Sequence, residues 1–172
     1  MPVAIALADD SLIVREGVGQ ILATESEMRV VASCGDLPSL LAAVDRERPD
    51  VVVTDIRMPP TSTDEGIRLA GLLRETHPGI GVVVLSNYAE PAYALALLES
   101  GSEGRAYLLK ERVHDRAQLV AAIEAVAAGG SVLDSKIVER SSRPSCASSA
   151  RHWPGSPDVS ERCLRRSRSV MG

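Results

Sequence analysis

The chain has 172 residues, of which 45% are hydrophobic and 2% aromatic, and it carries a formal net charge of −4. This length fits one soluble domain followed by a shorter segment, with a core of valine, leucine, isoleucine and alanine. No apolar run approaches the roughly 18 residues that a membrane span needs. The N-terminus has no basic residues before its short apolar run, so we expect a cytoplasmic protein that makes no contact with membranes. The three cysteines, Cys34, Cys146 and Cys163, are too scattered to predict a disulfide framework or a zinc site.

Short β-branched runs alternate with helical stretches up to about residue 138. The runs do not alternate polar with apolar residues, which indicates strands buried on both faces, as in a parallel sheet. In chain order we predict a strand at 3–8, a helix at 12–24, a strand at 29–33, a helix at 37–47, a strand at 51–54, a helix at 64–76, a strand at 80–85, a helix at 91–100, a strand at 105–109 and a helix at 115–128.

End signals support these helices. Thr63 is a candidate N-cap for the third helix and Pro78 ends it. Pro91 opens the fourth helix, and Gly129 follows the fifth. Five consecutive strand–helix units predict a doubly wound α/β domain, whose right-handed crossovers place helices on both faces of the sheet.

Polar residues follow four of the predicted strands at the point where each strand ends. Asp9 and Asp10 follow the first strand, Asp55 the third, Ser86 the fourth and Lys110 the fifth. Because the carboxyl ends of parallel strands share one edge of the sheet, we expect these side chains to lie together where open α/β folds bind ligands. Each residue alone is better explained as a turn acid, a helix cap or a solvated lysine. Their joint placement favours a functional site.

The charges of these side chains indicate their chemistry. Three neighbouring carboxylates repel one another unless a cation lies among them, and oxygen ligands favour a hard divalent ion such as Mg²⁺. With the ion bound, Asp55 could attack a phosphoryl group and form an aspartyl phosphate. The metal and Lys110 would neutralise the transferred oxygens, and Ser86 would hydrogen-bond one of them.

Four segments, LADD, VVVTDIRMPP, VVVLSNY and AYLLKE, resemble in their order and spacing the receiver domain of bacterial two-component response regulators. The resemblance covers about residues 3–128, and the stretch that begins SNYAEPAYALALLESG is similar in particular to the LuxR/NarL-type subfamily. It implies a flavodoxin-like (βα)5 fold, with a five-stranded parallel sheet in the order 2-1-3-4-5 and a receiver domain over residues 1–129.

The resemblance also implies roles for the acidic residues. Asp55 would be the phosphoacceptor, and Asp10 and Asp55 would ligate Mg²⁺. Asp9 would assist through a water molecule, and the main-chain carbonyl of Arg57 would complete the protein ligands.

Ser86 and Tyr107 occupy the family's switch positions, where the hydroxyl moves toward the phosphoryl group and the ring changes between outward and inward packing. The chain departs from the family pattern at Glu111, where many receivers have proline, and at Asn87, where a smaller residue is often found. The implied partners are a sensor histidine kinase and a second copy of the chain in a phosphorylation-dependent homodimer. The enzymatic character that we expect is limited to helping its own phosphorylation and dephosphorylation.

The helical and strand periodicity ends after Glu139. From residue 140 the chain holds seven arginines and two acids, with much serine and proline, which predicts disorder. We expect residues 130–139 to be a linker and 140–172 a basic tail in place of the subfamily's helix-turn-helix domain. One hypothesis is a frameshift near residue 140, because PGSPDVSERCLR, back-translated and read in another frame, is similar to the opening of such a domain. The alternative is an ordinary basic tail.

Two other functions stay open. A LuxR/NarL-type DNA-binding regulator would need a recognition helix, which the tail does not offer, so we do not expect DNA binding from this chain. A cofactor binder on the same fold would need a phosphate-binding loop rich in glycine, serine or threonine after the first strand. The residues Asp9, Asp10 and Ser11 stand there instead.

Overall fold

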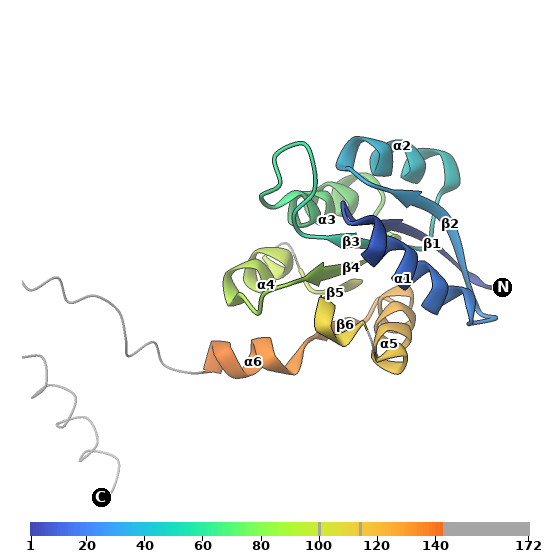
Figure 1. The fold of residues 1–172 in the computed structure, drawn as a ribbon. Helices are drawn as coiled ribbons and strands as arrows, with labels where there is room; N and C mark the ends of the chain where they lie inside the picture. Colours follow the sequence, from blue (N-terminus) through green and yellow to red (C-terminus); the bar gives the residue numbers. More distant parts are fainter. Residues whose placement is uncertain (100, 114, 143–172) are drawn as a thin grey trace, which may run out of the picture.

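The computed structural model describes residues 1–99, 101–113 and 115–142. Figure 1 shows a central sheet with helices on both of its faces. In chain order the elements are β1 (Val3–Ala8), α1 (Leu12–Ala23), β2 (Met28–Cys34), α2 (Leu37–Glu47), β3 (Val51–Asp55), α3 (Glu65–Thr76), β4 (Gly81–Ser86), α4 (Pro91–Leu98), β5 (Arg105–Leu109), the 3-10 turn η1 (Lys110–Arg112), α5 (Arg116–Ala127), β6 (Ser131–Leu133) and α6 (Ser135–Ser142). No helix among the described residues is long and apolar enough to cross a membrane.

All strands of the sheet are parallel, and their order is β2-β1-β3-β4-β5-β6. The predicted order 2-1-3-4-5 is therefore confirmed for five strands, but the predicted number is wrong because β6 adds a sixth at the edge beside β5. The segment that forms β6 is only three residues long, which is too short to show a strand pattern in the sequence. In the structure none of its residues is buried. Its position depends on pairing with β5 and not on an apolar run of its own.

The segment expected to be a linker, 130–139, holds β6 and most of α6. Helix α6 is held by Ile137, which is 1% exposed and packs in the core. Residues 140–142, the start of the expected tail, form the end of α6. The rest of that tail, residues 143–172, lies outside the described residues. The hypothesis of a frameshift near residue 140 rests on that part of the chain and stays a hypothesis.

The core consists of two apolar clusters, one on each face of the sheet. On one face α2, α3, α4 and α6 pack against alternate strand residues such as Val52 and Val84. On the other face α1 and α5 pack against the intervening residues, such as Val53 and Val83. Every residue of β3 and β4 is buried, which explains why their sequences are apolar without alternation.

The helix ends place the loops around the carboxyl edge of the sheet. Asp36 and Asp115 are N-caps of α2 and α5, and their carboxylates accept hydrogen bonds from Ser39 and Gln118 main-chain N–H groups. The predicted N-cap of α3, Thr63, is wrong by one residue, since Asp64 takes that position without a side-chain cap bond. The main-chain N–H groups of Thr61 and Thr63 in this loop donate instead to the carboxylate of Glu65.

Candidate functional site

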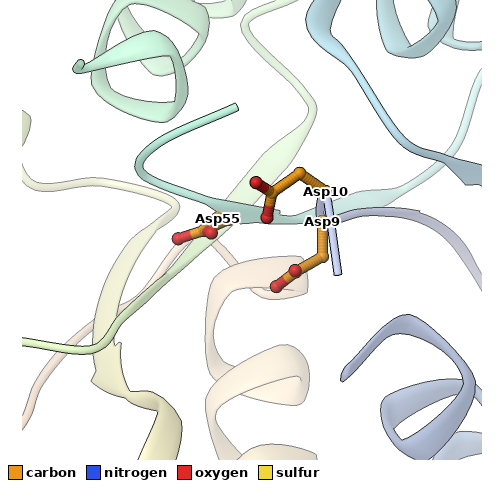
Figure 2. A group of neighbouring side chains, drawn as sticks. All are labelled: Asp9, Asp10 and Asp55. Atoms are coloured by element: carbon orange, nitrogen blue, oxygen red, sulfur yellow. The ribbon is translucent and has the colours of Figure 1, made fainter. Parts of the chain in front are cut away.

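The parallel register brings the ends of β1, β3, β4 and β5 to one edge of the sheet. Asp55 is the last residue of β3, Ser86 the last of β4, and Lys110 directly follows β5. Figure 2 shows the carboxylates of Asp9, Asp10 and Asp55 turned toward a common space, and one oxygen of each lies within 4.8 Å of the others. The expected convergence of the three acids is therefore present.

Lys110 joins the two buried acids of this group. Its Nζ lies 2.7 Å from Oδ2 of Asp9 and 2.7 Å from Oδ2 of Asp55. Asp9 is fully buried, Asp55 is 6% exposed, and Asp10 is exposed. Three carboxylates and one ammonium leave about two negative charges, which matches a divalent cation bound by oxygen ligands. The donor set therefore fits Mg²⁺.

Burial and charge shift the pKa values of the central pair. Burial raises the pKa of the Asp55 carboxyl, and the neighbouring Asp9 adds to this, while Lys110 opposes it. Burial alone would lower the pKa of Lys110, but its hydrogen bonds to Asp55 and Asp9 outweigh that effect and raise it. Lys110 is thus charged at neutral pH, and the site as a whole has a surplus of negative charge that a cation would reduce.

The two predicted switch residues meet at one main-chain oxygen. Ser86 Oγ donates to the carbonyl of Tyr88 at 2.8 Å and accepts from the Tyr88 N–H at 3.1 Å. The Tyr107 side chain is fully buried, and its hydroxyl donates to the same carbonyl at 3.1 Å. Ser86 therefore lies at the expected edge, but its hydroxyl is bonded within the loop that follows β4.

Glu65 is a residue that our sequence analysis missed. It is fully buried at the start of α3, and it accepts hydrogen bonds from the N–H groups of Thr61 at 3.0 Å and Thr63 at 2.9 Å, and from the Thr61 hydroxyl. Burial alone would raise its pKa, but these hydrogen bonds lower the pKa of Glu65 to about 2. The available signal was an acidic residue at the first position of the helix, directly after a loop rich in threonine and serine.

The next residue, Gly66, brings α3 against the phosphoacceptor candidate. A Cβ at this position would lie 2.2 Å from the carbonyl oxygen of Asp55. Glycine is required there because backbone approaches backbone without room for a side chain. Glu65 and Gly66 together fix the loop that begins at Asp55.

Arg57 presents its side chain beside the site. Its guanidinium donates to the Tyr93 hydroxyl at 3.2 Å and lies 5.8 Å from the ring centroid of Tyr88 and 5.9 Å from that of Tyr93. These distances are typical of cation–π contacts. A small pocket between this cluster and the sheet is lined by Asp55, Ser86 and Asn87, among others. The metal-binding role of the Arg57 carbonyl stays a prediction.

Comparison with known proteins agrees with this geometry. Residues 5–124 match the family model described as the response regulator receiver domain. The transcriptional regulatory protein DegU of Brevibacillus brevis is 36% identical over 135 residues, and the match covers 78% of this chain. It covers 54% of DegU, so the chain matches about half the length of that relative.

Two solved structures share both the fold and part of the sequence. The receiver domain of the putative response regulator NarL from Mycobacterium tuberculosis is 29% identical, with a TM-score of 0.66 over 74% of this chain and 98% of that domain. The response regulator ChrA of a heme-sensing two-component system is 34% identical, with a TM-score of 0.65 over 87% of this chain and 71% of ChrA. The chain therefore belongs to the response regulator receiver domain family, among relatives of the NarL/LuxR type.

Proposed function

We propose that this chain is the phosphoacceptor of a two-component system, in which Asp55 receives a phosphoryl group from a sensor histidine kinase. Asp10, Asp55 and the main-chain carbonyl of Arg57 would hold Mg²⁺, with Asp9 acting through a water molecule. The observation that carries the proposal is the position of Lys110, whose Nζ lies 2.7 Å from both buried carboxylates. A cation bonded to the Asp55 carboxylate supports the proposal, because it could neutralise the oxygens of a phosphoryl group carried by Asp55.

The transfer needs an ionised Asp55 carboxylate. One of its oxygens attacks phosphorus, and the electron pair of the bond to the donor leaves with the donor as the new P–O bond forms. Mg²⁺, when bound, supplies positive charge to the phosphoryl oxygens. Lys110 donates to one of these oxygens, because its ammonium has three N–H groups and can turn from the Asp55 oxygen. Ser86, once its hydroxyl leaves the Tyr88 carbonyl, donates a hydrogen bond to another of these oxygens.

Receiver domains act as signal transducers. We propose that the catalytic action of this chain is limited to its own phosphorylation and dephosphorylation. A homodimer that forms on phosphorylation is part of the same proposal. DegU is described as a transcriptional regulatory protein, but we do not extend DNA binding to this chain, since the match spans about half of that relative.

Intact-mass measurement tests the phosphoacceptor directly. The full chain is incubated with Mg²⁺ and acetyl phosphate, and we expect the mass of one added phosphoryl group in the wild type and none in Asp55→Asn. A matched control is Asp45→Asn, since the Asp45 side chain is 73% exposed on α2, away from the site. Uptake by Asp55→Asn equal to that of the wild type, or no uptake by the wild type, would refute the proposal.

A further inference from the structure

Helix α6 is fixed to the receiver close to the switch residues. Ile137 is 1% exposed and lies in the core cluster that includes Tyr107. The main-chain N–H of Asp134 donates to the carbonyl of Tyr107 at 3.0 Å, and the Asp134 carboxylate, buried, lies 3.4 Å from Nε of Arg112. The first turn of α6 is therefore held beside β5, and the helix contacts α4 (Figure 1).

One turn further along α6, Arg140 reaches the loop between β4 and α4. Its Nη1 donates to the main-chain carbonyl of Ala89 at 2.9 Å. The preceding carbonyl, of Tyr88, accepts from Ser86 Oγ at 2.8 Å and from the Tyr107 hydroxyl at 3.1 Å. Two successive carbonyls of one loop thus receive the switch hydroxyls and the α6 guanidinium.

The Ser86 hydroxyl has a single proton to donate. In this structure it donates to the carbonyl of Tyr88, so it cannot also donate to a phosphoryl group on Asp55. The Ser86–Tyr88 bond of this resting loop and a bond from Ser86 to a phosphoryl group therefore exclude each other. A contact made only in the resting loop opposes phosphorylation by the free energy with which it stabilises that loop.

We infer that Arg140 is a positioning residue for this loop: by binding the carbonyl of Ala89, it favours the state in which Ser86 is bonded to Tyr88, and so restrains phosphorylation. Because coupling between two sites is reciprocal, phosphorylation of Asp55 weakens the docking of the last turn of α6. The C-terminal end of α6 therefore changes its docking with the phosphorylation state of Asp55. The inference rests on the proposed function of Asp55.

The first experiment compares the full-length wild type with Arg140→Ala in the presence of Mg²⁺ and acetyl phosphate. We expect the steady-state ratio of phosphorylated to unphosphorylated chain to rise about two- to ten-fold, as the loss of one charge-assisted hydrogen bond predicts. Arg140→Lys keeps a charged donor and should stay closer to the wild type. Arg116→Ala is the matched control, since Arg116 is exposed on α5 and pairs with Glu25, and it should leave the ratio unchanged.

A second experiment separates positioning from a merely structural role. In a Ser86→Ala background there is no hydroxyl bond to break, so Arg140→Ala should no longer change the ratio. Amide hydrogen exchange in residues 135–142 should also become faster when the wild type is phosphorylated. An equal effect of Arg140→Ala with and without Ser86, or no effect in either, would overturn the inference while leaving the proposed function intact. No phosphate uptake by the wild type would overturn both.

Discussion

Replacing Glu65 by glutamine should weaken folding in a pH-dependent way. The carboxylate is fully buried and accepts from the N–H groups of Thr61 and Thr63. Glutamine keeps one acceptor oxygen and replaces the other by an NH2 group, which cannot accept, so at least one loop N–H loses its partner. The change lies 10 positions after Asp55, at the start of α3, where the loop that leaves Asp55 ends.

The magnitude follows from the shift in pKa. Hydrogen bonds overcome burial and lower the pKa of Glu65 from 4.5 to about 2, and each pKa unit corresponds to about 1.4 kcal/mol. The ionised carboxylate therefore adds about 3 kcal/mol to the free energy of unfolding above the unfolded pKa, and this contribution is lost as the pH falls toward the folded pKa. Between pH 7 and pH 3, roughly 2 kcal/mol of it should disappear.

Urea unfolding of the wild type and Glu65→Gln at a series of pH values measures this loss. The difference between their unfolding free energies should shrink by roughly 2 kcal/mol from pH 7 to pH 3. Glu75→Gln is the control, since Glu75 is exposed on the same helix, and its difference from the wild type should stay flat. A constant difference for Glu65→Gln as well would refute the assignment of a strongly hydrogen-bonded, ionised carboxylate.

Three further outcomes follow from the same structure. Asp10→Asn should weaken Mg²⁺ binding at least about ten-fold by titration calorimetry, because it removes one charge from the acidic group; unchanged affinity would place the metal elsewhere. Gly66→Ala should lower the free energy of unfolding by about 1–3 kcal/mol and slow phosphate uptake, since its Cβ would meet the carbonyl oxygen of Asp55 at 2.2 Å; wild-type values in both assays would contradict this contact. Tyr107→Phe removes one donor to the Tyr88 carbonyl and should cost about 1 kcal/mol in urea unfolding; no loss would show that this bond adds nothing to stability.

The parts of the fold that the sequence predicted correctly are those whose residues are apolar because they are buried. β3 and β4 are apolar at nearly every position because helices cover both faces, and Asp55 and Ser86 stand out as polar residues at their ends. β6 could not be predicted in this way, since its stability comes from pairing with β5 and leaves its own residues exposed or half-buried. α6 was missed because Ile137 is its one residue in the core clusters among those described.

Some features of the candidate site could likewise be predicted from the sequence, and others could not. The convergence of Asp9, Asp55 and Lys110 could be predicted because parallel strands share one edge, whatever the details of packing. The role of Glu65 could not, since its partners are N–H groups that every loop residue carries, and only the path of the loop turns them inward. The shared bonding of Ser86 and Tyr107 to one carbonyl likewise depends on that conformation of the backbone, which residue identities do not specify.

The short strand β6 also covers an edge of the sheet that would otherwise be open to other chains. It pairs with β5 through Arg105, Ala106 and Tyr107, in a strand whose five residues are all buried. Without β6, that edge would present unpaired N–H and C=O groups beside an apolar run, a surface that recruits strands from other molecules. A chain shortened to end before residue 131 should therefore self-associate, because Ser131, Val132 and Leu133 no longer cover this edge of the sheet.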